Sequence, residues 1–190
     1  MKRLLLILAA AVGLVWTVQA QEKRTAVQTA GIAFYNLENL FDTIPNNPEG
    51  RDAEYTPAGA KQWDGRKYRN KINNLAYAIS QFTTKTTPYG PAVIGVSEIE
   101  NKSVLDDLVA NPALAPWKLQ VVHHDSPDAR GVDVGLLYNP RYFKLENVTN
   151  HRLHAVPFRT RDQMCVVGSL LGQRIAVIVN HWPSRLGGQE

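Results

Sequence analysis

Hydrophobic residues along this chain follow two patterns, one helical and one of short continuous runs. Between residues 65 and 85 they recur at spacings of four, three, four and three. The residues of this stripe are Tyr68, Ile72, Leu75, Ile79 and Phe82. The spacing places them on one side of a helix and predicts that the helix packs on a core through that side. Leu105, Leu108 and Val109 indicate a second, shorter helix, which Asn111-Pro112 ends.

Continuous apolar runs predict strands on either side of these helices. Ile32 to Tyr35 predict a short buried strand, and "AVIGVSEIEN" predicts another that ends in acidic residues. Further strands are expected in "WKLQVVHH", "VDVGLLYN", "MCVVGSLL" and "RIAVIVNH", with Leu171-Gly172-Gln173 as a hairpin turn. The segment from Asp42 to Gly65 reads as a long loop. This order of elements predicts an α/β sandwich with helices packed on a sheet face.

The N-terminal residues have the pattern of a secretory signal peptide. Lys2 and Arg3 precede an apolar run from Leu4 to Trp16, and Val18-Gln19-Ala20 offers a small-residue cleavage site. We therefore expect residues 1–20 to be removed and the mature protein to be exported, either periplasmic or extracellular. The apolar run is too short and too poorly flanked for a stable membrane span. Residues 21–190 are then expected to belong to one domain.

Composition and charge narrow the functional classes. The chain of 190 residues is 44% hydrophobic and 20% charged, which suits one ordinary globular domain. Loss of Lys2 and Arg3 lowers the formal net charge from +4 to +2. Bulk charge therefore gives no argument for strong nucleic-acid binding, and an anionic ligand would have to be held locally. Cys165 is the only cysteine, so the chain forms no disulfide within itself.

Polar residues follow three separate apolar strands, namely Asn36, Glu98 and His181. Strand ends in a sheet protein converge on one rim, where sites are usually built. A carboxylate, an amide and an imidazole together suit metal-assisted attack on a phosphate ester, because the carboxylate holds a hard cation and the imidazole moves or orients a proton. Each residue also has a structural alternative. Asn36 could cap a turn, Glu98 could begin the next helix, and His181 could be a structural histidine.

Four stretches in order along the chain carry a family resemblance. They are "FYNLENLFD", "GVSEIENKSVLDDL", "RGVDVGLLYNP" and "NHWPSR", and they resemble motifs of the endonuclease/exonuclease/phosphatase superfamily, whose fold is that of deoxyribonuclease I. The resemblance implies that Asn36 contacts the scissile phosphate and helps to order the metal site. It implies that Glu98 is the principal metal ligand and that His181 lies at the scissile phosphate. The implied cofactor is Mg²⁺, with Mn²⁺ or Ca²⁺ as alternatives, and the implied substrate is a phosphodiester or phosphomonoester, with nucleic acid favoured.

Other residues take roles by the same resemblance. Asp133 would meet His181 from a nearby strand and fix its tautomer, although a surface or turn-anchoring acid is the alternative. Arg130 and Arg185 would engage phosphate oxygens, and solvated loop arginines are the alternative. Supporting positions around the site are Glu38, Asn39 and Glu100.

The family motifs "GD-x-N" and "S-D-H", which follow the histidine motif in family members, do not occur in this sequence. In the family they position the attacking water and supply the general base. We therefore expect the chain to be the first half of a four-layer α/β-β/α sandwich whose second half is missing, and to be inactive or impaired by itself. The alternative is a non-catalytic secreted domain that binds a metal ion or an anion.

Overall fold

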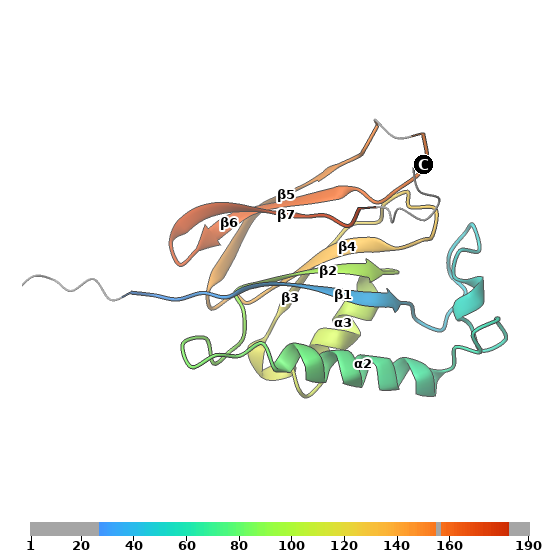
Figure 1. Ribbon diagram of the computed structural model, residues 1–190, viewed down its shortest axis with the longest axis horizontal. Helices are drawn as coiled ribbons and strands as arrows, with labels where there is room; N and C mark the ends of the chain where they lie inside the picture. The colour runs from blue at the N-terminus through green and yellow to red at the C-terminus, as the bar shows by residue number, and fades with distance from the viewer. Residues whose placement is uncertain (1–26, 155–156, 183–190) are drawn as a thin grey trace, which may run out of the picture.

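The structure is a computed structural model, and it describes residues 27–154 and 157–182. Within these residues the chain forms two sheets, with order β1-β2-β4-β3 in the four-stranded sheet and β5-β6-β7 in the three-stranded sheet. Figure 1 shows α2 and α3 on one side of the four-stranded sheet and strands β5 to β7 on its other side. The predicted signal peptide and Arg185 lie outside the described residues.

The four-stranded sheet is mixed. Strands β1 and β2 run parallel, whereas β4 runs antiparallel to both of its neighbours, β2 and β3. Their bounds are Ile32–Leu40 for β1, Val93–Ile99 for β2, Gln120–His123 for β3 and Asp133–Tyr138 for β4. These directions bring the ends of β1, β2 and β3 and the start of β4 to one rim of the sheet.

The three-stranded sheet is antiparallel throughout. Its strands are β5 (Phe143–His151), β6 (Gln163–Leu170) and β7 (Gln173–Val179). Leu171 and Gly172 join β6 to β7 with φ angles of 49° and 87°. Positive φ at both central residues is what a two-residue hairpin turn requires, so the predicted hairpin is confirmed.

Two α-helices, α2 (Gly65–Ser80) and α3 (Lys102–Ala110), lie in the part of the chain that the structure describes, with short 3-10 turns at Ala53–Tyr55 and Ala115–Trp117. The Asp64 side chain begins α2 by accepting a hydrogen bond from the backbone N–H of Lys67. Asn101 begins α3 in the same way. No helix among the described residues is long and apolar enough to cross a membrane.

Two hydrophobic cores hold the layers together. One lies between the helices and the four-stranded sheet and contains the buried part of the predicted stripe, with Ile72, Leu75 and Ile79 inside and Tyr68 and Phe82 at its edge. The other lies between the sheets. Its buried residues are Val93, Val122, Val134, Leu136, Phe143, Met164, Val166 and Val179. The second core fixes how β7 lies relative to β2 and β4, and the site depends on that packing.

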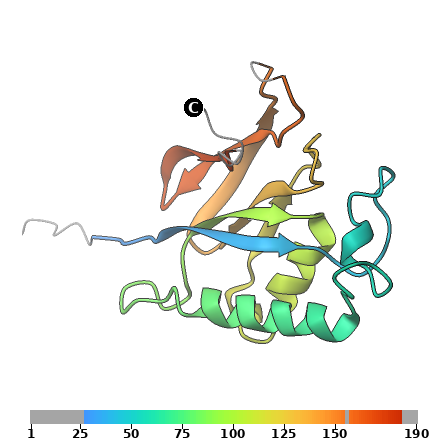
Figure 2. The ribbon, with the colours of Figure 1, turned by 45° about the vertical axis from the view of Figure 1, so that its right-hand side comes forward.

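The first predicted strand is less buried than we expected. Ile32 is 64% exposed and Phe34 is 53% exposed. The reason is that β1 is an edge strand. Within the four-stranded sheet, the buried residues of the core between the sheets come from β2, β3 and β4 but not from β1. Figure 2 shows β1 running beside β2, its one partner in the sheet. The prediction of a buried strand here is therefore wrong on one face, while the α/β class and the helix-on-sheet packing are confirmed.

Candidate active site

Irregular backbone marks the rim where β1 and β2 end. The register of β1 against β2 shifts between Asn36 and Leu40, and that of β2 against β4 shifts between Ser97 and Ile99. Glu98 lies in the second irregularity with φ of 59°. Residues other than glycine rarely adopt this left-handed backbone conformation, and those that do are often found at functional sites. The bulge lets Ser97 and Ile99 stay buried while Glu98 reaches the rim.

The Glu98 carboxylate is the centre of a group of polar contacts. Its Oε1 lies 3.1 Å from His181 Nε2, and its Oε2 accepts a hydrogen bond of 3.1 Å from the backbone N–H of Asn39. An ionised carboxylate only accepts hydrogen bonds, so His181 Nε2 carries the proton of this contact. Arg130 Nη1 lies 3.5 Å from the same Oε1. Three backbone segments thus deliver a donor to one carboxylate.

The pKa of Glu98 is held below its ordinary value. Burial alone would raise the pKa, but the hydrogen bond with His181, the charge of Arg130 and a smaller contribution from Asn36 outweigh it. Glu98 is therefore ionised at neutral pH. The amide of Asn36 is held by the N–H of Glu38, which donates to Asn36 Oδ1 at 2.7 Å.

The Glu98 carboxylate supplies the kind of oxygen ligand that a hard divalent cation prefers. Mg²⁺ is commonly bound by one or two carboxylates, with waters and substrate phosphate completing its coordination. The ionised Glu98 matches that donor chemistry. Asn36 lies on the neighbouring strand opposite Ser97, the residue before Glu98, and its amide oxygen already accepts the hydrogen bond from Glu38. The contact between Glu98 and His181 agrees with the prediction that they share one rim, and Asn36 lies on the strand beside Glu98. The roles predicted for the three residues stay predictions.

Arg130 reaches the site from the loop between β3 and β4. Its Nη2 donates to Asn39 Oδ1 at 2.5 Å, and its side chain is half exposed. It lies beside the carboxylate and its side chain remains open to solvent. Arg185, the other arginine predicted to bind phosphate, is not among the described residues.

Asp133 has a different partner from the one predicted. Its Oδ2 lies 3.0 Å from His123 Nε2, and its Oδ1 accepts hydrogen bonds from the N–H and hydroxyl of Ser126. His123 is on the neighbouring strand, paired with Gly135, whereas His181 follows a strand of the other sheet. The prediction that Asp133 fixes the tautomer of His181 is therefore wrong, and Asp133 instead closes the β3–β4 loop that carries Arg130.

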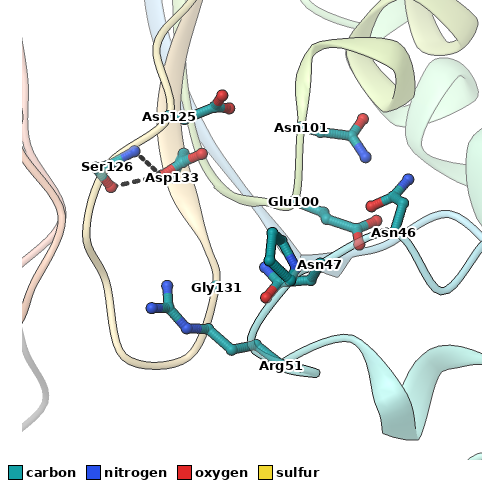
Figure 3. Close-up of a pocket in the computed structure, with 10 residues that line it drawn as sticks. Asn46, Asn47, Arg51, Glu100, Asn101, Asp125, Ser126, Gly131 and Asp133 are labelled. Atoms are coloured by element: carbon teal, nitrogen blue, oxygen red, sulfur yellow. Dashed lines mark hydrogen bonds between the residues drawn. The ribbon is translucent and has the colours of Figure 1, made fainter.

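A polar cavity of about 260 Å³ lies next to Asp133. Figure 3 shows Asp125 and Asp133 on one side of it and Glu100 and Asn46 on the other. Glu100 accepts a hydrogen bond from the backbone N–H of Asp42, but burial raises its pKa to about 7. Through this hydrogen bond Glu100 supports the loop that follows β1.

Two buried charged residues near the site were missed from the sequence. Asp128 lies in "SPDARG" and Arg161 in "FRTRDQ", which read as solvated loops, yet the two side chains are only 4% and 5% exposed. Nothing local in the sequence signals this burial, because it results from packing between segments that are 33 positions apart.

Comparison with known proteins identifies the class. A profile described as the endonuclease/exonuclease/phosphatase family matches residues 31–190. The chain belongs to that family. A search of curated proteins finds no match.

Solved structures add to this at the level of the fold. The chain is similar to a humanized D. rerio TDP2, with a TM-score of 0.50 and 11% identity, over 82% of this chain and 48% of that one. It is also similar to the human Nocturnin catalytic domain with bound sulfate (TM-score 0.38, 23% identity, 51% of this chain and 39% of that one). A third similar structure is ANGEL2, a 2′,3′-cyclic phosphatase, with a TM-score of 0.41 and 13% identity, over 82% of this chain and 43% of that one. The chain therefore spans about half the length of the TDP2 structure.

Proposed function

We propose that this chain carries the metal-binding part of the active site of a divalent-metal-dependent phosphoester hydrolase, most simply a phosphodiesterase or nuclease. The observation that supports it is the meeting of Glu98 with His181 and Arg130, which come from different parts of the fold. A structural cap would explain one such polar residue, but it does not explain an ionised carboxylate surrounded by an imidazole and a guanidinium on strained backbone.

Each residue has a role that follows from its chemistry. Glu98 and Asn36 would hold the cation, which when bound supplies Lewis-acid polarisation of a phosphoryl oxygen. Mg²⁺ is the proposed ion, and Mn²⁺ or Ca²⁺ have the same preference for oxygen. Arg130 binds a phosphate oxygen through its planar guanidinium. His181 presents the Nε2 proton toward Glu98, and the same N–H can donate to a phosphoryl oxygen bound beside that carboxylate.

The proposed substrate is a phosphodiester, with nucleic acid favoured among the phosphoesters that a family of this kind can hydrolyse. A formal charge that is only slightly positive means that Arg130 and the cation would provide most of the local attraction. We also propose export to the periplasm or the extracellular space, which rests on the N-terminal sequence pattern alone.

The test is a pair of glutamate variants. Glu98→Gln removes the charge at the site, whereas Glu146→Gln removes an exposed acid that pairs with Arg174 on the second sheet. Mg²⁺ and Mn²⁺ binding is measured by calorimetry, and hydrolysis of bis(p-nitrophenyl) phosphate and of linear DNA is followed with and without EDTA. We expect Glu98→Gln to abolish metal binding and metal-dependent turnover, and Glu146→Gln to leave both unchanged.

The outcomes separate the two candidate functions. Metal binding that depends on Glu98 without any turnover would favour a non-catalytic metal-binding domain. Turnover that persists in EDTA or in Glu98→Gln would contradict the proposed site.

A further inference from the structure

Arg161 has an unusual position for an arginine. Its guanidinium is almost completely buried and donates in three directions. Nη1 donates to Asp128 Oδ2 at 2.7 Å, Nε donates to the backbone oxygen of His181 at 2.7 Å, and Nη2 lies 3.4 Å from the backbone oxygen of Trp182. Arg161 therefore holds the backbone of the residue that presents the site imidazole.

Asp128 extends this contact to the β3–β4 loop. Its Oδ1 accepts a hydrogen bond of 2.9 Å from the backbone N–H of Arg130, and its backbone oxygen accepts from Gly131 N at 3.1 Å and from Arg51 Nη1 at 2.6 Å. Asp128 thus fixes the turn from which the Arg130 side chain leaves. The buried carboxylate of Asp128 thus holds the backbone of Arg130, and Arg161, which is bound to Asp128, holds the backbone of His181.

These contacts close a ring around the site. Arg161 binds Asp128, and Asp128 binds the backbone of Arg130. The Arg130 guanidinium lies against Glu98, and Glu98 contacts the imidazole of His181. The backbone of His181 returns to Arg161. The more exposed part of the ring, with Arg130, Glu98 and His181, is the candidate active site. Its buried part is the ion pair of Arg161 and Asp128.

We propose that Arg161 is a positioning residue that, through Asp128, holds Arg130 and His181 at a fixed separation on either side of Glu98. Which chemistry this serves rests on the proposed function, but the coupling itself does not. A buried ion pair is weak evidence for stability, since desolvation offsets much of the attraction. A guanidinium fork, however, fixes directions that the ammonium of lysine cannot reproduce.

The experiment uses two conservative variants of the full chain. Arg161→Lys keeps the charge but loses the fork, and Asp128→Asn keeps the shape but loses the charge. Arg174→Lys is the matched control, because Arg174 in β7 also pairs with a carboxylate, that of Glu146 at 2.9 Å, but its side chain is exposed. The readouts are the NMR signals of the His181 imidazole and the Arg130 Nε–H, together with thermal unfolding.

Asp128→Asn gives the sharpest result, because Asp128 has no hydrogen bond to His181 among the described residues. We expect the His181 imidazole signal to shift in Asp128→Asn and in Arg161→Lys, while Arg174→Lys leaves it unchanged. A folded Asp128→Asn that moves the Arg130 signal alone would overturn the coupling. Should Arg161→Lys fail to fold, Asp128→Asn still decides the proposal by itself.

Kinetics separate this proposal from the proposed function. If the chain, or a longer form that contains it, hydrolyses a phosphodiester, we expect kcat to fall at least about tenfold and KM to rise in both variants, well below their melting temperatures. Folded variants whose kcat and KM both match the wild type would overturn the positioning role. If no phosphodiester is hydrolysed at all, the proposed function fails, and the His181 signal still tests the coupling.

Discussion

Glu98 and His181 meet across the two sheets of the sandwich, with 3.1 Å between Oε1 and Nε2. Glu98 is the last polar residue of β2 in the four-stranded sheet, whereas His181 follows β7 in the three-stranded sheet. Their contact therefore depends on the core between the sheets, where Val93 and Val179 are buried together. Any change that lets the sheets slide will separate the imidazole from the carboxylate, even when both residues remain in place in the sequence.

Arg130 places a positive charge where a divalent cation would have to approach Glu98. Arg130→Gln removes that charge, so we predict tighter cation binding in the absence of substrate. The Nη1–Oε1 distance of 3.5 Å and the half-exposed side chain limit the effect to about three- to tenfold in Kd.

Titration calorimetry with Mg²⁺ and with Mn²⁺ measures this change, and Arg69→Gln on the exposed side of α2 serves as control. The same Arg130→Gln variant should raise KM for a phosphodiester, because a phosphate contact is lost. Weaker cation binding in Arg130→Gln would show that the arginine supports the cation site instead of competing with it.

The sequence predicted a helix, strand or turn correctly wherever a local pattern determines that element by itself. The stripe of α2, the apolar run of β2 and the turn at Leu171-Gly172 each follow from local spacing and backbone preference. The exposure of Ile32 and Phe34 does not, because an apolar run reads the same in a central and an edge strand. Only strand order decides it, and strand order is a property of the whole chain.

Some features of the candidate site could likewise be predicted from local sequence patterns, and others could not. The rim position of Asn36, Glu98 and His181 was predictable because each follows an apolar run in the sequence. The partner of Asp133 was not, because the sequence does not tell which of two histidines lies across the sheet from it. His123 is one strand away, whereas His181 follows a strand of the other sheet. The buried pair of Asp128 and Arg161 also needed the tertiary structure.

Gly168 should tolerate no side chain. A Cβ at this position in β6 would lie 2.3 Å from Phe143 Cζ and 2.5 Å from the backbone oxygen of Lys144. Phe143 is fully buried between the sheets, so it has little room to move. We predict that Gly168→Ala destabilises the fold by about 2 kcal/mol or more, as measured by urea unfolding.

The control for this substitution is Gly65→Ala at the start of α2. There a Cβ would meet only the mobile end of Arg69, at 3.1 Å. Alanine favours helices over glycine, so this variant should be neutral or slightly more stable. Equal losses for Gly65→Ala and Gly168→Ala would show that the crowding at Phe143 is not the cause.

Asn101 connects the site strand to α3 and should matter for stability. Its side-chain oxygen accepts from the backbone N–H of Val104 at 3.2 Å, and its amide donates to Asp42 Oδ2 at 3.0 Å. Asn101→Ala should cost about 1–2 kcal/mol, or roughly 2–8 °C in Tm. Asn101→Ser keeps the helix cap but loses the contact with Asp42, so its Tm should fall between those of the wild type and Asn101→Ala.

Tyr68 gives the fold a dependence on alkaline pH. Burial raises the pKa of its phenol, and the hydrogen bond of 2.7 Å from its hydroxyl to Asp107 raises it further. The folded protein therefore keeps the phenol proton at a pH where the unfolded chain has already lost it. The free energy of unfolding should then decrease as the pH rises above 10, the ordinary tyrosine pKa.

Tyr68→Phe removes this dependence, although it also removes the hydrogen bond to Asp107. We expect the variant to be less stable than the wild type at pH 8 and to lose less of its stability between pH 10 and pH 11. Tyr77→Phe is the matched control, because Tyr77 is on the same helix and is 66% exposed. Urea unfolding at several pH values gives the slope of the unfolding free energy against pH for each variant. Identical slopes above pH 10 for the wild type and Tyr68→Phe would mean that the proton held in the folded state is not that of Tyr68.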